Sequence, residues 1–366
     1  MNLSFKIKTW LMMKVLERQR KKEPFDGQKA DMFQLPADAG PMINNSYFFG
    51  ANGADGHSLI MRVGRRNAPL CEIFVIYVTP DGHLYTSVKD HYPVEECPMH
   101  VECVEAEKHF KVWFDGQLLD TVTGEKVACK YALDFHATLP IFSALHHSDF
   151  RGMAQAFARP KWNKEFFRSV GGDTGAISKE DKTIPQIHYE QAGHFTGYIE
   201  LETLKPETLK LETLKRLIDM PGSRDHAYGK RDWNYMSDHI WLMVTTAKGE
   251  TFNFSLVDYP KVTGVFCGYT NIGYDHDESL VDYKIIQYDA NDGKAPDVFI
   301  VDCTFTDGKT VRVTARRENN LYLTFDNGNF FFQEGVGEVD FGGIKCRGSI
   351  EYGFNKDKSR WGIAPN

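Results

Sequence analysis

Short strand-like runs separated by tight turns fill most of the sequence and limit the folds open to it. Residues 45–138 contain four runs rich in aromatic and β-branched residues, accompanied by turn signals such as Asp81-Gly82 and Asp115-Gly116. Such dipeptides beside apolar runs are typical of β-hairpins. Because hairpins this close together leave no room for crossover helices, we expect an antiparallel sheet.

The same pattern returns after a helical interval. Between Ser148 and Val170 apolar residues recur at helical spacing, and Pro160 predicts a break within this segment. Residues 171–183 are polar and contain glycine, which predicts a linker. Strand-like runs resume from residue 186 to 354. The predicted fold is therefore all-β, with two tandem antiparallel barrels or sandwiches joined by a helical segment.

The length of the chain supports this division. At 366 residues it exceeds what one hydrophobic core usually serves. Its 26 Phe, 16 Tyr and 6 Trp suit twisted sheets and the lining of an apolar pocket. We predict a basic N-terminal arm over residues 1–40, a first β domain over 41–147, a helix and linker over 148–183, and a second β domain over 184–366.

Charge is distributed unevenly along the chain. Residues 1–22 contain seven Lys or Arg and one Glu, although the formal net charge of the whole chain is −7. The acidic remainder argues against nucleic-acid binding, because phosphate contacts need clustered basic residues. Residues 5–22 are expected to form a short helical arm. It either packs on its own protein or contacts a membrane surface peripherally through Trp10, Met13 and Leu16.

Several sequence motifs are absent, and their absence guides the prediction of the cellular compartment and of cofactors. The seven cysteines are scattered and form no Cys-x-x-Cys, and no run approaches the roughly 18 apolar residues of a membrane span. We expect a cytoplasmic protein, with or without membrane association. The adjacent His146 and His147 diverge on either a helix or a strand, so no metal site is predicted. No phosphate or dinucleotide motif occurs, and no cofactor is expected.

A short repeat interrupts the second half. Glu-Thr-Leu-Lys recurs with a period of five over residues 202–215. That period matches neither the helical 3.6 nor the strand 2.0, so the unit cannot turn one face to a core. We predict an expanded hairpin loop and assign it no function.

The densest polar cluster lies between residues 222 and 233. In an extended strand Asp225 faces one side, while His226 and Tyr228 project together from the other, as a proton-handling pair in a barrel cavity requires. Asp225 beside Arg224 can stay ionised and hold an imidazole in one tautomer. The alternative is a buried salt-bridge network that closes a barrel end.

A second polar group precedes this cluster. Strand alternation places His188 and Glu190 on one face. Inside a barrel, desolvation would raise the pKa of Glu190 and make it a proton donor near neutral pH. The alternative is an outward polar face.

These segments resemble a known superfamily. His188-Tyr189-Glu190-Gln191, residues 224–233 and residues 342–353 are similar to the hydroxyneurosporene synthase (carotenoid 1,2-hydratase) and AttH-like superfamily, and the resemblance covers roughly residues 40–355. That group has two lipocalin-like domains and is similar to kievitone hydratases, tocopherol cyclases and fungal lipocalin-like Diels–Alderases. The hydratase motif reads Asp-His-x-Trp, and its catalytic His and Trp correspond here to His226 and Tyr228. Compared with the tryptophan of the hydratase motif, a tyrosine at position 228 keeps an aromatic ring in the wall of the site and adds a hydroxyl group.

The resemblance implies cofactor-free acid/base chemistry of the hydratase, cyclase or isomerase type. The substrate it implies is a hydrophobic isoprenoid- or polyketide-like molecule, and the competing hypothesis is a non-catalytic carrier of such a ligand. Neither the substrate nor the oligomeric state follows from the sequence. The catalytic residues so assigned are Asp225, His226, Tyr228 and Glu190, and the ligand-binding residues are His188, Arg224, Trp233 and Tyr259.

Overall fold

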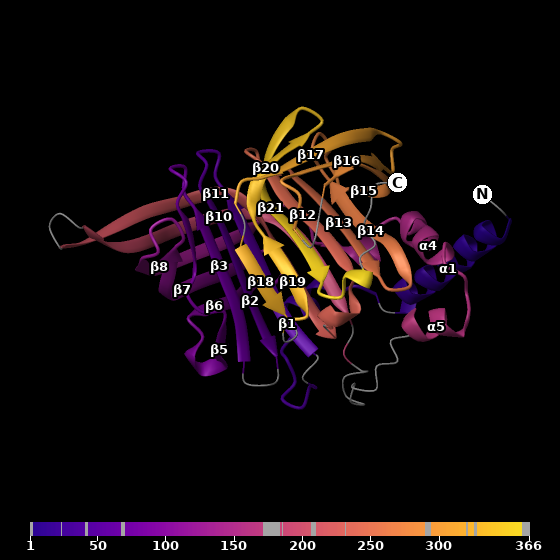
Figure 1. Ribbon diagram of the computed structural model, residues 1–366, viewed down its shortest axis with the longest axis horizontal. Helices are drawn as coiled ribbons and strands as arrows, with labels where there is room; N and C mark the ends of the chain where they lie inside the picture. The colour runs from indigo at the N-terminus through magenta and orange to yellow at the C-terminus, as the bar shows by residue number, and fades with distance from the viewer. Residues whose placement is uncertain are drawn as a thin grey trace.

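The computed structural model contains two closed antiparallel barrels of eight strands each, side by side, with an N-terminal helix (Figure 1). The predicted all-β fold class is confirmed. The structure describes residues 3–22, 24–40, 43–66, 70–170, 184, 186–205, 210–230, 232–289, 294–319, 321–325 and 328–360.

The first barrel is a ring closed by a long hairpin. Its strands are β1 (Ile43–Asn52), β2 (Ser58–Arg66), β3 (Leu70–Val78), β4 (Leu84–Ser87), β7 (His109–Asp120), β8 (Lys126–Ala137), β10 (Ile187–Lys205) and β11 (Lys210–Lys230). The ring runs β11-β1-β2-β3-β4-β7-β8-β10, and the pairing of β10 with β11 closes it. Three short strands pair with β3, β7 and β10 outside the ring, namely β5 (His91–Pro93), β6 (Met99–Glu105) and β9 (Phe142–Ser143).

The second barrel closes by the pairing of its first and last strands. These strands are β12 (Asp238–Thr246), β13 (Thr251–Tyr259), β14 (Val262–Thr270), β15 (Glu278–Tyr288), β16 (Val298–Phe305), β17 (Thr310–Arg317), β20 (Val336–Phe341) and β21 (Ile344–Asn355). Strand β12 pairs with β21 to complete the ring. A side hairpin attaches to β21 and consists of β18 (Leu321–Phe325) and β19 (Phe330–Glu334).

The division between the barrels differs from the predicted one. Strands β10 and β11 were assigned to a second domain beginning at residue 184, but they pair with β8 and β1 and complete the first barrel. The boundary between the two sheets therefore falls after Lys230. Local sequence patterns identify strands but not their partners, and only closure of the ring gives the edges of β1 and β8 their hydrogen bonds.

The helical segment is an insertion in the first barrel that packs on the second. Helices α3 (Ala144–His147), α4 (Arg151–Ala158) and α5 (Lys164–Val170) lie between β9 and β10 in the chain. The break predicted at Pro160 is confirmed, since it separates α4 from α5. Ala156 and Phe166 pack against Val262 of β14. The predicted linker over residues 171–183 lies outside the described residues.

Both barrel interiors are packed apolar cores. On β7 the burial alternates residue by residue, so that Phe110 faces inward while its neighbours face outward. Phe49 and Phe135 meet edge to face in the first barrel, with ring centroids 6.2 Å apart. Phe254 and Phe299 lie 6.0 Å apart in the second.

The two barrels contact each other through their outer faces. Phe48, Ile60 and Phe74 of the first barrel form one apolar cluster with Trp241 and Met243 of the second. Because β2 and β12 are covered on both faces, their burial is nearly continuous rather than alternating. Polar side chains on these outer faces are therefore enclosed between the barrels.

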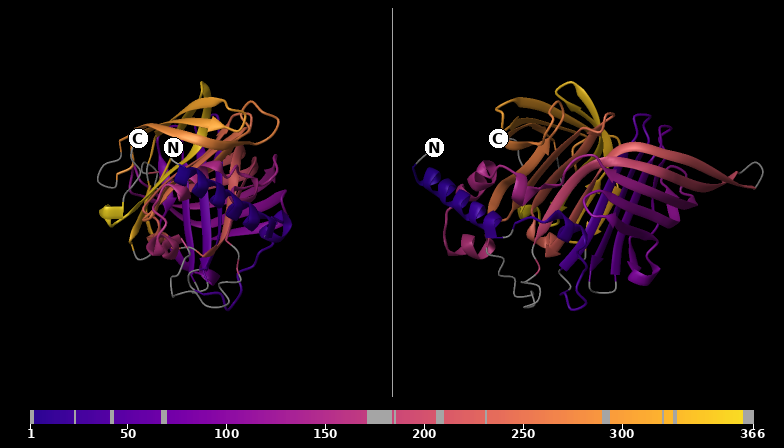
Figure 2. Two further views of the ribbon diagram at one scale, coloured as in Figure 1. Left: turned by 90° about the vertical axis from the view of Figure 1, so that its right-hand side faces the viewer. Right: turned by 180° about the vertical axis from the view of Figure 1, so that it is seen from behind.

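The N-terminal helix α1 (Leu3–Lys22) packs on its own protein, beside α4 (Figures 1 and 2). Leu16 is buried against Phe150, and the Nζ of Lys8 donates a 2.6 Å hydrogen bond to the carbonyl of Pro160. Met13 also faces the protein, whereas Trp10 is 59% exposed. The three residues expected to form one apolar face are thus divided between two faces. Among the described helices, none combines the length and apolarity needed to cross a membrane.

The Glu-Thr-Leu-Lys repeat extends the hairpin of β10 and β11. Backbone pairing continues from Glu202 opposite Thr213 to Lys205 opposite Lys210. The hairpin protrudes from the first barrel at the left of Figure 1. The expanded hairpin is therefore present, and it consists of paired strands rather than an open loop.

Candidate functional site

Strand alternation separates the polar cluster of β11 into two groups. Asp225 lies on the outer face of the first barrel, where it lines a cavity. Arg224 and His226 lie on the opposite side of the strand and have no exposed surface. On β10, His188 and Glu190 share the side of Asp225. The predicted alternation of these residues is correct, but the cavity lies on the other side of the strand from His226.

The cavity lies between the outer faces of the two barrels and has a volume of about 270 Å³. Its position differs from the predicted barrel interior, because apolar side chains fill both interiors. Ligand sites commonly lie at such boundaries between domains. Four aromatic residues form much of its wall: Phe48, Trp233, Trp241 and Tyr259.

His188 and Asp225 form an ion pair at the edge of this cavity. In the register of β10 and β11, Glu190 lies opposite Asp225, so His188 reaches Asp225 diagonally. The imidazole Nε2 contacts a carboxylate oxygen of Asp225, and 37% of the histidine side chain is exposed. A carboxylate in this position orients the imidazole and stabilises its protonated form. The role of Asp225 as a charged orienter stays a prediction, and the imidazole that its carboxylate contacts is that of His188.

Glu190 lies directly behind this pair. Its Oε1 lies 3.9 Å from Nε2 of His188 and accepts a 3.1 Å hydrogen bond from Nε1 of Trp241, which comes from the second barrel. The pKa of Glu190 is raised to about 8, mainly by burial; the charge of His188 opposes this rise, and the charge of Asp225 adds to it. A pKa of about 8 favours the protonated form of Glu190 at neutral pH, and the carboxyl lies beside a histidine that faces the cavity.

A second histidine–carboxylate pair lies on the wall contributed by the second barrel. Nδ1 of His239 is 3.1 Å from Oε1 of Glu351, and both residues line the cavity. Glu334 lies behind them with no exposed surface, and burial together with the charge of Glu351 holds its pKa well above the usual range. Each histidine–carboxylate pair thus has behind it a buried carboxyl whose pKa is raised.

Sequence patterns did not identify this second group. Its members lie far apart in the chain, and they meet because β12 and β19 both pair with β21. Strand alternation along each segment would place them on a face, but only strand pairing brings the three faces together.

Arg224 belongs to a buried network that closes one end of the first barrel. The short helix α2 (Gly27–Asp31) ends at this opening. The carboxylate of Asp31 accepts hydrogen bonds of 2.7 and 3.0 Å from the two terminal nitrogens of Arg224, and neither side chain is exposed. The backbone N–H of Glu107 donates to the same carboxylate at 2.7 Å. The alternative hypothesis of a salt-bridge network closing a barrel end describes this arrangement.

His226 is part of the same network. Its Nδ1 lies 2.5 Å from the hydroxyl of Tyr189, and its Nε2 lies 2.7 Å from the side-chain oxygen of Asn45. The ring also stacks on Tyr47, with centroids 3.9 Å apart. Burial and the charge of Arg224 hold the pKa of His226 well below its usual range, so the ring is neutral. Both nitrogens are occupied inside the barrel, and the ring does not face the cavity.

Tyr228 likewise lies away from the cavity. Its ring stacks on Phe33 at 3.9 Å, and it packs with Ala30 and Ile141. Burial raises the pKa of its hydroxyl to about 12.

Of the eight residues assigned from the sequence, four line the cavity and Glu190 lies directly behind it, while Arg224, His226 and Tyr228 face elsewhere. The four that line it are His188, Asp225, Trp233 and Tyr259.

The ligand atoms of His188, Glu190 and Asp225 lie within 4.8 Å of one another, a spacing that a metal ion could bridge. A metal ligand must be deprotonated, however, and the raised pKa of Glu190 opposes this.

Comparison with known families decides where this chain belongs. The model of a family described as a domain of unknown function, DUF7064, matches residues 28–356. The chain belongs to the DUF7064 family. The match to DUF7064 includes α2, both barrels and the cavity between them, and it leaves out α1.

Solved structures similar to this DUF7064 chain include two of comparable length. The crystal structure of CghA aligns with a TM-score of 0.47 and 8% identity, over 93% of this chain and 96% of that one. The crystal structure of kievitone hydratase from Nectria haematococca aligns with a TM-score of 0.49 and 8% identity, over 92% and 94%. No curated protein matches the sequence.

Proposed function

We propose that the cavity between the barrels is an active site for acid/base chemistry on a hydrophobic small molecule. The observation that carries this proposal is the His188–Asp225 pair, which faces an aromatic cavity and has the protonated Glu190 behind it. A positioned acid with a pKa near the working pH is what general acid catalysis requires.

The reaction begins with proton transfer from His188. Its imidazolium, stabilised by Asp225, protonates an alkene carbon or a carbonyl oxygen of the substrate. The faces of Trp233 and Trp241 stabilise the positive charge that develops. Solvent then reprotonates the imidazole, whose side chain is 37% exposed, while the neutral carboxyl of Glu190, 3.9 Å from Nε2, adds no second negative charge beside Asp225.

The second pair completes the reaction from the opposite wall. His239, with Glu351 beside it, accepts the proton that is released when water or an internal nucleophile adds to the cation. Addition of water gives a hydratase, addition of an internal nucleophile gives a cyclase, and loss of a carbon-bound proton gives an isomerase. The resemblance described above favours an isoprenoid- or polyketide-like substrate.

The size of the cavity restricts the substrate. Its volume of about 270 Å³ lies near the lower limit of ligand pockets, which is about 300 Å³. The cavity therefore suits a small molecule or one end of a longer chain.

Incubation in D₂O with a panel of candidate substrates tests this proposal. We expect that one member of a panel of terpenoid alkenes, prenylated phenols and unsaturated polyketides gains deuterium at carbon, detected by mass spectrometry. The variant H188A should lose this incorporation. The matched control is H100A, because His100 is a half-buried histidine on β6 that does not line the cavity.

The carrier hypothesis predicts a different outcome from the same cavity. A carrier would bind a panel member at one equivalent and release it unchanged and without deuterium. Native mass spectrometry of the protein with each compound distinguishes the two functions. Binding by wild type and H188A alike, with no incorporation in either, would reject the catalytic proposal.

A further inference from the structure

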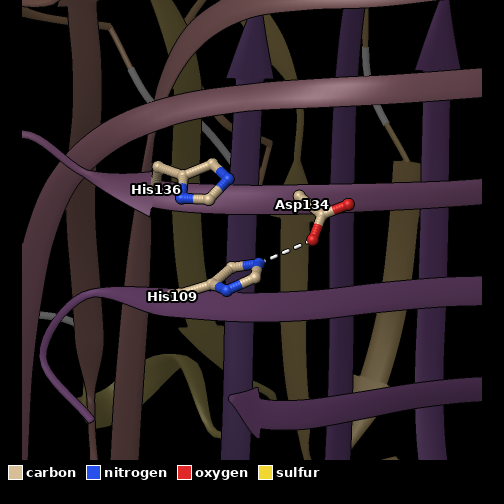
Figure 3. Close-up of side chains that lie close together, drawn as sticks. All are labelled: His109, Asp134 and His136. Carbon is tan, nitrogen blue, oxygen red and sulfur yellow. Dashed lines mark hydrogen bonds and ion pairs between the residues drawn. The ribbon is translucent and has the colours of Figure 1, made fainter. Parts of the chain in front are cut away.

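A cluster of metal-ligating side chains lies on the outer face of the first barrel, apart from the cavity. It consists of His109 on β7 and Asp134 and His136 on β8 (Figure 3). Their chain neighbours Phe110 and Phe135 are fully buried, so strand alternation directs the three polar side chains outward. None of the three lines the cavity.

The cluster is compact. His109 and His136 are direct partners in the β7–β8 register, and their rings stack with centroids 4.3 Å apart. Nε2 of His109 lies 2.6 Å from Oδ1 of Asp134. One ligand atom from each residue lies within 4.8 Å of the others.

This spacing is close to that of a tetrahedral metal site. Metal–ligand bonds of about 2.0–2.1 Å place neighbouring ligand atoms about 3.3 Å apart. The two imidazole rings are stacked with their planes 18° apart, so both must turn before a nitrogen of each points at a shared ion. The hydrogen bond between His109 and Asp134 then opens to admit the ion. The backbone need not move, because the ladder of β7 and β8 already fixes both strands.

We propose that His109, Asp134 and His136 bind a divalent transition-metal ion, of which Zn²⁺ fits best. Two imidazole nitrogens and one carboxylate oxygen match the preference of Zn²⁺, whereas Ca²⁺ and Mg²⁺ prefer oxygen ligands alone. The side chain of Asp134 is 40% exposed and His136 is an exposed residue, so an ion in solution can reach them. A tetrahedral site needs a fourth ligand, which is either a water molecule or one more side chain.

A third histidine lies beside His136 on the next strand of the sheet. His194 of β10 lies opposite His136, and its buried neighbour Phe195 shows that it also faces outward. Its Nε2 contacts Asp219 at 2.5 Å, and its side chain is 39% exposed. A change of rotamer would turn it toward the ion as a fourth ligand. The expectation of no metal site depended on residues close together in the chain, such as His146 and His147, whereas cross-strand pairing creates this cluster from separate segments.

Isothermal titration of the metal-free full-length chain with ZnCl₂ tests the site. We expect wild type to bind one equivalent of Zn²⁺. In H136A and in H109A we expect the affinity for this ion to be at least ten-fold weaker. H100A is the matched control, as a half-buried histidine of the same barrel outside the cluster. H188A tests whether the ion binds at the cavity instead. Circular dichroism checks that all variants remain folded.

Cobalt provides a second measurement that reports on the ligands. CoCl₂ added to wild type should produce visible d–d absorption that is retained in H188A and absent in H136A and D134N. Zinc binding should also weaken in acid, because protons compete with the ion for both imidazoles. Equal zinc uptake by wild type and H136A, or loss of uptake in H188A alone, would overturn the proposal.

Discussion

The carboxylate of Asp225 contacts the imidazole of His188 on the neighbouring strand and not that of His226, which follows it in the chain. The two histidines lie on opposite sides of the β10–β11 hairpin and meet different environments. His188 faces an aromatic cavity, and His226 is enclosed at the end of a barrel. The proposed function therefore assigns proton exchange with the substrate to His188 and not to His226.

Substitution of each histidine should separate activity from stability. For H188A we expect deuterium incorporation to fall by roughly 10²–10⁴-fold, the usual contribution of a general acid or base, with an unchanged unfolding midpoint. For H226Q we expect a lower urea midpoint and incorporation within a few-fold of wild type. If H188A and H226Q both remain folded and lose deuterium incorporation equally, the assignment of proton transfer to His188 and of stability to His226 is contradicted.

Glu190 should make stability depend on pH. Its pKa is about 8 in the folded protein and about 4.5 in a solvated chain, so between these values the folded state holds one proton more. The free energy of unfolding contributed by this group therefore falls as the pH rises from 4.5 to 8. The decline is on the order of a few kcal/mol, at about 1.4 kcal/mol per pH unit.

The variant E190Q should lack that decline, because glutamine stays neutral. Urea unfolding of wild type and E190Q at several pH values between 5 and 8 measures the difference in slope. E200Q is the control, since Glu200 lies on the same strand in an exposed ion pair with Lys215. Parallel curves for wild type and E190Q would show that Glu190 is ionised in the folded state.

The ion pair between Asp31 and Arg224 should be important for stability. Both side chains are fully buried, and D31N leaves the guanidinium without its countercharge. Removal of one partner from a buried pair costs about 3–5 kcal/mol. We expect the urea midpoint of D31N to fall accordingly, while K215M, which breaks an exposed pair on the β10–β11 hairpin, leaves it unchanged. A D31N midpoint like that of wild type would show that α2 does not stabilise the barrel.

The outer side of α1 supports a further proposal. Ile7, Trp10, Leu11 and Val15 are each at least 40% exposed, and Lys and Arg side chains flank them. We propose peripheral contact between this side and an anionic membrane surface, by apolar insertion and charge attraction. In sedimentation assays we expect binding to phosphatidylcholine vesicles that contain phosphatidylserine, weaker in W10A and at high salt.

A matched control for this experiment exists on the first barrel. Trp113 is 37% exposed on β7, so W113A removes a similar ring from another surface. Binding that W10A and W113A reduce equally would argue against a specific role for α1. Absence of binding to the anionic vesicles would reject the membrane proposal and leave α1 as a helix packed on its own protein.

Local sequence determined much of the fold. Hairpin signals and alternating apolar residues predicted antiparallel barrels, and apolar residues at helical spacing with Pro160 predicted a broken helical segment. These features depend on residues near one another in the chain, where turn chemistry and side-chain periodicity act directly. The same alternation correctly placed Asp225 and His226 on opposite sides of one strand.

The tertiary structure decided which side of that strand carries the site. Alternation assigns residues to two faces but cannot tell which face is covered by a core, by solvent or by another domain. The packing of the second barrel on the outer face of the first encloses His188 and Asp225 in a cavity and adds His239 and Glu351 from distant strands. The proposed metal site also required strand pairing, because residues 109 and 136 become neighbours when β7 pairs with β8, and residue 194 joins them when β10 pairs with β8.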